Sequence, residues 1–234
     1  MKLSDVLSVK RRIFINRFLS LGVIITAILS IIFALITFYG QNAGNFVMSI
    51  DAAAKLRGIV MSETEDFEIK TTRLLSDPVI DARDVTYAWL KIDEVKNTSG
   101  NYYDRDHDYV AYTFYLKNDG LETVDLVYYL RITSIYNNLD KSIRVLIIED
   151  DEETVYKRPD EISHNQYPDD YPRTTHFLTD RMVARKNITN FRPNQIKKFS
   201  VLIWIEIYDP DTTDDILGGM IRMEMVFSVF GTSD

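Results

Sequence analysis

A long uncharged and apolar segment near the N-terminus constrains this chain more than any other feature. From Phe18 to Tyr39 no residue is charged, and most residues are Phe, Leu, Ile or Val. As a helix that rises about 1.5 Å per residue, the segment would be about 33 Å long, enough to cross a hydrocarbon core of about 30 Å. The segment therefore predicts a transmembrane helix over residues 18–39.

A cluster of basic residues lies on the N-terminal side of this segment. It comprises Lys10, Arg11, Arg12 and Arg17, with Lys2 further from the segment. Because cytoplasmic flanks of membrane helices are enriched in Lys and Arg, residues 1–17 are predicted to be a cytoplasmic tail, with the rest outside the cell membrane. A cleavable signal peptide is the alternative, but its apolar region is typically about 7–15 residues and ends in small residues, which Gln41-Asn42-Ala43 matches poorly. We therefore expect an uncleaved single-pass anchor between Phe18 and Tyr39.

Composition narrows the function classes for the remaining chain. The sequence is 46% hydrophobic and 26% charged, which fits a packed globular core rather than a disordered chain. It contains no Cys, so disulfides, thiolate metal sites and Cys nucleophiles are excluded for this sequence. The net charge of -8 disfavours a nucleic-acid partner.

Strand-like alternation of apolar and polar residues runs through the region beyond the anchor. It is clear over residues 85–89, 110–117, 124–133, 143–147, 199–207 and 221–229, and weak over 46–50. Asn118-Asp119-Gly120 tolerates positive φ, so residues 110–117 and 124–133 are predicted to form an antiparallel hairpin. Residues 51–76 are ambiguous, although Ala52 to Leu56 favours a helix.

These strands predict a mainly β domain built from antiparallel sheets. No amphipathic helix of ordinary length separates them, which disfavours a doubly wound fold. One sheet would leave apolar faces in water, and burying each Phe, Ile or Leu contributes about 1.5–3 kcal/mol, so two sheets should pack as a sandwich. We expect a linker over 40–45, one extracellular β-sandwich over 46–230 and a C-terminal tail over 231–234.

Three stretches carry a family resemblance: Tyr112 to Gly120, Ile143-Arg144-Val145, and Ile203 to Asp211 with Gly218-Gly219. The chain resembles uncharacterised membrane-anchored extracytoplasmic proteins of low-GC Gram-positive bacteria. More distantly, its layout is similar to camelysin and TasA-like proteins, which implies an antiparallel jelly-roll-like β-sandwich behind the N-terminal helix. The camelysin likeness implies a metal-dependent peptidase as one alternative. The TasA likeness implies an extracellular fibre subunit, with residues 46–50 as the exchanged strand.

An acidic connection between two strongly patterned strands is the most distinctive candidate site. Its carboxylates are Asp209, Asp211, Asp214 and Asp215. Carboxylate oxygens are the ligands that calcium prefers, so one interpretation is a calcium site; the other is a polar connection whose carboxylates stay apart. A second acidic stretch, beginning at Asp104, lacks the Gly and Glu of an EF-hand, because Tyr109 and Tyr115 occupy those positions.

Tyrosines in the expected loops form a candidate binding surface. They are Tyr102, Tyr103, Tyr109, Tyr167 and Tyr171. Aromatic side chains in loops offer contact area to a protein or carbohydrate at low entropic cost.

Signs of catalysis are sparse. The histidines are His107, His164 and His176. The sequence has no His-Glu-x-x-His motif, Gly-x-Ser-x-Gly turn or Gly-rich phosphate loop, although His164 and His176 could converge with Asp169 or Asp170 on a metal. We expect no enzyme and no cofactor beyond possible calcium. The expected function is a membrane-anchored cell-surface module for structural or protein–protein roles in the envelope, with the lipid bilayer and envelope proteins or itself as partners.

Overall fold

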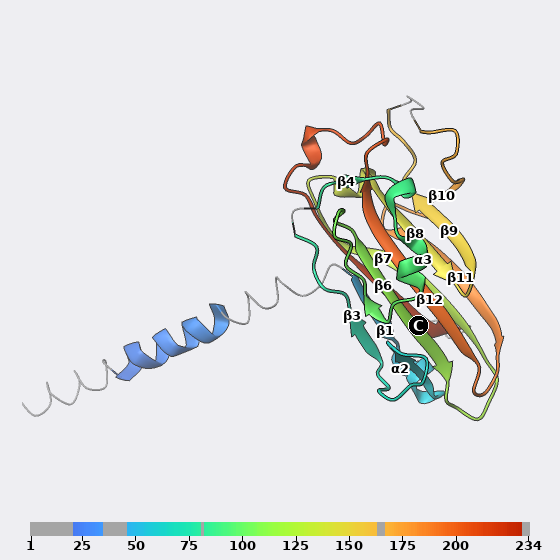
Figure 1. Cartoon of the computed structure of the whole chain (residues 1–234). Coiled ribbons are helices and arrows are strands. Elements are labelled where there is room, and N and C mark those ends of the chain that lie inside the picture. Colours follow the sequence, from blue (N-terminus) through green and yellow to red (C-terminus); the bar gives the residue numbers. More distant parts are fainter. Residues whose placement is uncertain (1–20, 35–45, 81, 163–166, 231–234) are drawn as a thin grey trace, which may run out of the picture. The chain divides into compact units, whose positions relative to one another are not determined.

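The computed structural model describes residues 21–34, 46–80, 82–162 and 167–230 (Figure 1). The chain divides into two compact units, Met1–Ala43 and Gly44–Asp234. In order, the elements of the second unit are β1 (Phe46–Ile50), α2 (Ala52–Leu56), β2 (Ile59–Ser62), β3 (Arg73–Leu75), β4 (Asp84–Val85), η1 (Tyr87–Trp89), α3 (Ile92–Lys96), β5 (Gly100–Asn101), β6 (Val110–Asn118), β7 (Val124–Tyr136), η2 (Leu139–Lys141), β8 (Ile143–Glu149), β9 (Glu152–Lys157), β10 (Thr174–His176), β11 (Met182–Phe191), β12 (Ile196–Glu206), η3 (Asp214–Ile216) and β13 (Met220–Val229).

The described part of the first unit is a helix over residues 21–34. Among the described residues, no helix has both the length and the apolar character needed to cross a membrane. The predicted span extends beyond the described helix at both ends, through 18–20 and 35–39. These ends, with Phe18 and Tyr39, lie outside the described residues, as do the basic tail 1–17, the linker 40–45 and the tail 231–234.

The second unit is mainly β and consists of two sheets, which confirms the predicted sandwich. A five-stranded sheet has the order β11-β7-β13-β1-β3. An eight-stranded sheet has the order β10-β9-β8-β12-β6-β2, and in addition β4 pairs with β12 and β5 with β6. The strands β6, β8, β12 and β13 occupy the regions where the sequence alternates most clearly.

Aromatic rings from both sheets meet in the core between them. Phe114 on β6 stacks on Phe199 of β12 with ring centroids 5.4 Å apart. Phe227 on β13 lies 5.3 Å from Phe199, and Tyr128 on β7 lies 5.6 Å from it. All four rings are at most 1% exposed. These contacts hold the sheets face to face, since buried aromatic pairs add geometric preference to the burial of apolar area.

The predicted hairpin between residues 110–117 and 124–133 is wrong. β6 lies in the eight-stranded sheet and β7 in the five-stranded one, so the connecting turn passes from one sheet to the other. Asn118 fixes this crossing by donating its side-chain amide to the carbonyls of Glu122 and Phe191, both at 2.8 Å. Gly120 packs so closely that an added Cβ would lie 2.1 Å from the Arg57 carbonyl oxygen. The residues favour a turn, but tertiary contacts decide that it joins two layers.

The sheets are also not purely antiparallel. Parallel pairs join β1 to β13, β10 to β9 and β4 to β12. The expected strand over 85–89 is wrong as well, because only Asp84–Val85 pairs and the chain then turns into the 3-10 helix η1. Ala52–Leu56 is helical as favoured, and Asp51 caps it by accepting from the Ala54 amide at 2.7 Å.

The eight-stranded sheet is buried on both faces, which the sequence did not predict. Its outer face is covered by the segment containing β4, η1 and α3, and together they enclose a second apolar cluster. The cluster consists of Val85, Leu90, Val95, Tyr109, Ala111, Leu146, Ile148, Val155, Leu202 and Trp204. Residues 110–117 were expected to be half-buried, yet every residue from Val110 to Leu116 is buried. The charged residues considered next continue this outer face.

Candidate functional site

A row of large side chains crosses three neighbouring strands at one end of the eight-stranded sheet. Arg144 on β8 lies beside Trp204 of β12 and beside Lys157 of β9. Side chains at matched positions on paired strands share a face, so these three point to the same side as the second apolar cluster. Glu206 follows two residues after Trp204 and shares that face. The sheet thus gathers cationic and anionic groups where its apolar covering ends.

Arg144 and Asp209 form an ion pair whose two side chains have no exposed surface. The Arg144 guanidinium also donates to the Ile143 carbonyl and to the Tyr167 hydroxyl. Burial alone would lower the pKa of Arg144, but the Asp209 carboxylate raises it overall. Burial raises the pKa of Asp209 despite Arg144. A guanidinium does not lose its proton in proteins, so its fixed charge keeps the carboxylate beside it ionised near neutral pH.

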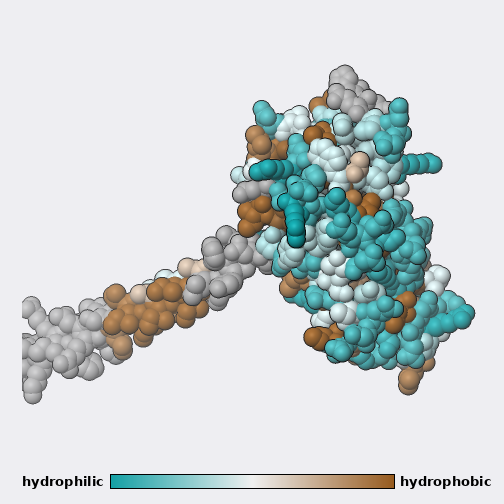
Figure 2. All heavy atoms as spheres, viewed as in Figure 1, coloured by the Kyte–Doolittle hydropathy of each residue, from teal (hydrophilic) through white to brown (hydrophobic). Residues whose placement is uncertain are grey.

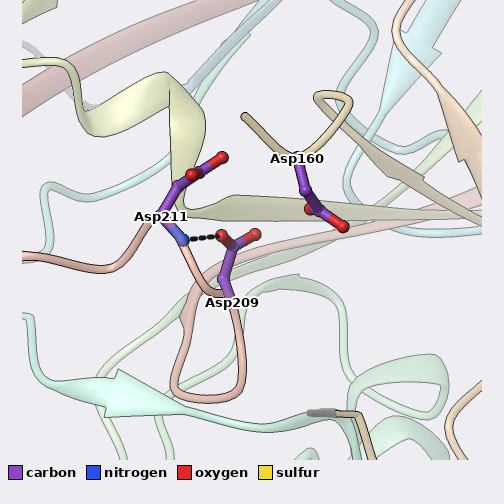
Figure 3. A group of neighbouring side chains, drawn as sticks. All are labelled: Asp160, Asp209 and Asp211. Carbon is purple, nitrogen blue, oxygen red and sulfur yellow. Dashed lines mark hydrogen bonds between the residues drawn. The ribbon is translucent and has the colours of Figure 1, made fainter. Parts of the chain in front are cut away.

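Asp160 and Asp211 complete a group of three carboxylates with Asp209 (Figure 3). One oxygen from each lies within 4.8 Å of the others. The amide of Asp211 donates to Asp209 Oδ1 at 2.8 Å, which fixes the acidic loop on itself. The Asp211 carboxylate then accepts from the amides of Glu161 and Ile162 at 2.7 and 3.0 Å. Asp211 therefore joins the loop after β12 to the loop after β9.

Two tyrosines contact this charged group. Both cations lie over the face of the Tyr167 ring, whose centroid is 4.8 Å from Lys157 Nζ and 5.5 Å from the Arg144 guanidinium carbon. The Tyr171 hydroxyl donates to Glu206 at 2.7 Å, and the Trp204 indole donates to the same oxygen at 2.9 Å. Burial raises the pKa of both tyrosines, so they remain protonated donors at neutral pH. Beside them is an open polar hollow of about 430 Å³.

Each of the three carboxylates already has a partner, and two of these partners are cations. Arg144 pairs with Asp209, and Lys157 pairs with Asp160. Asp211 is occupied by two backbone amides, which also stabilise a negative charge. A calcium ion takes six to eight oxygen ligands and would have to compete with both cations for this space. The donor set does not fit calcium while Arg144 and Lys157 hold these positions, and the arrangement acts as a structural clamp between two loops.

The four predicted calcium ligands divide into two places. Asp209 and Asp211 belong to the buried group. Asp214 and Asp215 lie on the short helix η3 and are exposed, outside that group. The third carboxylate of the group is instead Asp160, from a distant part of the sequence. Only the first half of the acidic loop therefore contributes carboxylates to the buried group.

The five predicted surface tyrosines also divide. Tyr167 and Tyr171 belong to the charged group described above, whereas Tyr102, Tyr103 and Tyr109 line a different hollow. Tyr109 is 6% exposed and belongs to the second apolar cluster. Its hydroxyl can be buried because it donates a hydrogen bond to Asp104 at 3.0 Å. Tyr103, at 68% exposed, is the tyrosine of this group that presents most of its ring to solvent.

The histidines do not assemble a metal centre within the described residues. The group of potential metal ligands found there contains carboxylates alone. His176 is exposed on β10, and His107 stacks on Trp89 with centroids 5.1 Å apart. His164 lies outside the described residues.

Sequence reasoning missed Arg144, Lys157 and Asp160. A signal for Arg144 was present, because it is the only charged residue in the apolar run Ile143 to Ile148. A charge within a buried strand requires a buried partner. Nothing local identifies which acidic residue that partner is, since Asp209 lies far along the chain.

Comparisons with known proteins give no family. No protein-family model matches the chain, and no curated protein matches it. Two crystal structures of a beta-glucosidase from Kluyveromyces marxianus align with it. The complex with glucose is 10% identical with a TM-score of 0.22, covering 71% of this chain and 15% of that one. The Se-Met labelled form is 12% identical with a TM-score of 0.23, covering 72% of this chain and 16% of that one. Likeness this slight carries no argument about fold or activity.

Proposed function

We propose that this chain is a membrane-anchored cell-surface protein whose β-sandwich makes protein contacts in the cell envelope. The observation that carries the proposal is the helix over residues 21–34, which has no charged residue. Its large apolar side chains are 44–69% exposed, and Figure 2 shows the helix as hydrophobic, whereas the visible face of the β-domain is largely hydrophilic. A helix that is apolar all round is stable where lipid or a protein core surrounds it.

Polar groups within this helix support a lipid environment. The Thr26 hydroxyl donates to the Gly22 carbonyl at 2.9 Å, one turn earlier. A hydroxyl satisfied within its own helix requires no water, which lowers the cost of placing it in lipid. The cluster of basic residues at positions 10–17 favours an N-terminus in the cytoplasm and a β-domain outside.

Contact rather than catalysis is the function that the described site supports best. The carboxylates of Asp160, Asp209 and Asp211 are engaged by cations or amides, which leaves no open ligand position for a metal-bound water. The camelysin-like alternative depends on His176 or His164, and His176 does not belong to the group of potential ligands. In the fibre alternative β1 is exchanged, but β1 is paired on both sides, by β13 and β3.

Membrane fractionation of the full chain tests this proposal. In the variant Ile24→Lys/Ile28→Lys, each Lys disfavours insertion by about 2.5–3.5 kcal/mol near the helix centre, so the protein should leave the alkali-washed membrane fraction. Ile24→Leu/Ile28→Leu is the matched control and should stay in it. Protease added to intact cells should digest the β-domain. Retention of the double-Lys variant in membranes, or protection of the β-domain, contradicts the proposal, and a mature chain that begins near Ala43 indicates a cleaved signal peptide instead.

A further inference from the structure

A second hollow lies where the segment after β3 meets the loop before β6. Its volume is about 170 Å³. Pockets for drug-sized ligands span about 300–1,000 Å³, and one water takes about 30 Å³ of liquid, so this hollow has room for a single side chain. Its wall includes Asp77, Tyr103, Asp104, His107 and Asp108.

Three carboxylates line the hollow, and the basic side chain in its lining is that of a histidine, His107. Asp77, Asp104 and Asp108 line it, whereas its lining includes no Lys or Arg. Among the described residues, no Lys or Arg makes a salt bridge with any of the three. This distinguishes the hollow from the Arg144 group, where two cations balance the carboxylates.

Asp104 is the buried member of the set. Its side chain is 3% exposed, and it accepts from the Asp106 amide at 2.9 Å and the Tyr109 hydroxyl at 3.0 Å. Burial alone would raise the pKa of Asp104, but these hydrogen bonds and His107 lower it overall. The carboxylate is therefore ionised at neutral pH, although the nearest basic group, His107 Nδ1, is 3.9 Å away. That buried His107 nitrogen has no hydrogen-bond partner among the described residues. The hollow thus holds a carboxylate that hydrogen bonds stabilise and that, among the described residues, no lysine or arginine neutralises.

Three tyrosines, Tyr102, Tyr103 and Tyr109, line the same hollow. Tyr102 stacks on Tyr109 with centroids 6.4 Å apart, and Trp89 stacks on His107. The Tyr103 hydroxyl is hydrogen-bonded to Asp77, which fixes the exposed ring at the edge of the hollow. The faces of aromatic rings attract cations, and the attraction increases where water is partly excluded.

We propose that this hollow binds the side chain of a lysine or arginine from a protein partner. Negatively charged carboxylates, aromatic rings and room for one side chain together match an alkyl chain that ends in a positive charge. The inference rests on the proposed function, because it names the chemistry by which the β-domain would recognise another envelope protein. Asp108, which is exposed, meets the incoming charge first, and Asp104 lies deeper.

Binding of short peptides to the full-length protein in detergent tests the inference. The probe is the blocked peptide Gly-Ser-Lys-Ser-Gly, its control is the same peptide with acetyl-lysine, and tryptophan fluorescence reports binding because Trp89 contacts His107. The charged peptide should bind, more weakly as salt increases, and the acetylated one should not. Asp108→Asn should weaken binding about fivefold, the loss of about one surface charge interaction. Tyr103→Ala should weaken it as well.

Asp215→Asn is the matched control variant, since it removes the same charge from an exposed position on η3 and should leave affinity unchanged. Equal binding of both peptides, or an unchanged affinity in Asp108→Asn, overturns the inference. So does phosphoethanolamine binding as tightly as the peptide, which would assign the hollow to a lipid headgroup. If the peptide fails to bind a chain that fractionates with membranes, the inference fails and the proposed function stands. If it binds a chain that does not fractionate with membranes, the reverse holds.

Discussion

Replacing Arg144 by Met tests whether the buried ion pair is a structural clamp. Arg144→Met keeps most of the side-chain volume but removes the counter-ion of Asp209, and neither of the paired side chains has exposed surface. An unpaired buried charge of this kind destabilises a protein by about 3–5 kcal/mol, a large share of the typical 5–15 kcal/mol. In a domain of this size each kcal/mol lowers Tm by about 2–4 °C, so Tm should fall by about 6–20 °C.

The second substitution, Asp209→Asn, shows whether the lost stability comes from the unpaired charge of Asp209. Asn keeps an oxygen that can accept from the Asp211 amide, as Asp209 Oδ1 does at 2.8 Å, but carries no charge. Introduced into Arg144→Met, it should therefore restore about 2 kcal/mol, because the uncompensated charge disappears. Urea unfolding with a common m-value gives the free energy of unfolding of the wild type, the two single variants and the double variant. If Asp209→Asn lowers stability further in the Arg144→Met background, the reasoning is refuted.

A surface pair and a pH series serve as controls. Arg131 pairs with Glu224 at 2.8 Å, but its side chain is 49% exposed, so Arg131→Met should change stability by no more than about 1 kcal/mol. Without Arg144, burial favours the protonated form of Asp209, whose pKa is already raised in the wild type. A carboxyl whose folded pKa is raised loses stability as the pH rises, so Arg144→Met should be less stable at about pH 8 than at about pH 5.

Three further outcomes are expected. Phe199→Ala removes a ring that packs against three other aromatics and should cost about 3–5 kcal/mol in urea unfolding, whereas Ile196→Ala, at a 38% exposed position, should cost under about 1 kcal/mol. Asn118→Asp loses an amide that donates to two carbonyls at 2.8 Å and should cost about 1–3 kcal/mol, more than Asn137→Asp in an exposed loop; equal losses would count against the crossing turn. Because the pKa of Asp104 is lowered in the folded state, its ionised carboxylate stabilises the fold fully above about pH 4, and this stabilisation is lost as the pH falls through the folded-state pKa. The difference in Tm between the wild type and Asp104→Asn should therefore close in acid, and a difference that persists at about pH 2 contradicts this.

Alternation along the chain was enough to predict several strands of the sandwich. β6, β12 and β13 lie where apolar residues recur at every second position, because their inward faces pack on the opposite sheet. The second face of β6 was not predictable in this way. Ala111 and Tyr115 stand at positions that alternation assigns to solvent, and they are buried, Ala111 beneath the segment that precedes β6. Alternation reports the contrast between two faces and does not detect a cover added later by tertiary contacts.

Pairing was beyond the reach of local sequence. Asn118-Asp119-Gly120 has the residues of a tight hairpin, yet it passes between layers, because β6 pairs with β12 and β7 with β13 across long sequence separations. A turn signal specifies backbone conformation over a few residues. Which strands then pair depends on how all the apolar faces are buried together.

The candidate sites show the same division. Sequence alone determined the uncharged apolar segment, the absence of Cys, the mainly β character and the acidic run from Asp209, since each depends on residue type and order. Only the tertiary structure decided that Asp209 faces Arg144, that Asp160 joins it while Asp214 and Asp215 do not, and that the Asp104 side chain is buried beside His107 with no lysine or arginine partner among the described residues. The physical reason is that the effect of a charge depends on its neighbours and its access to water, and both are set by chain segments far away in sequence.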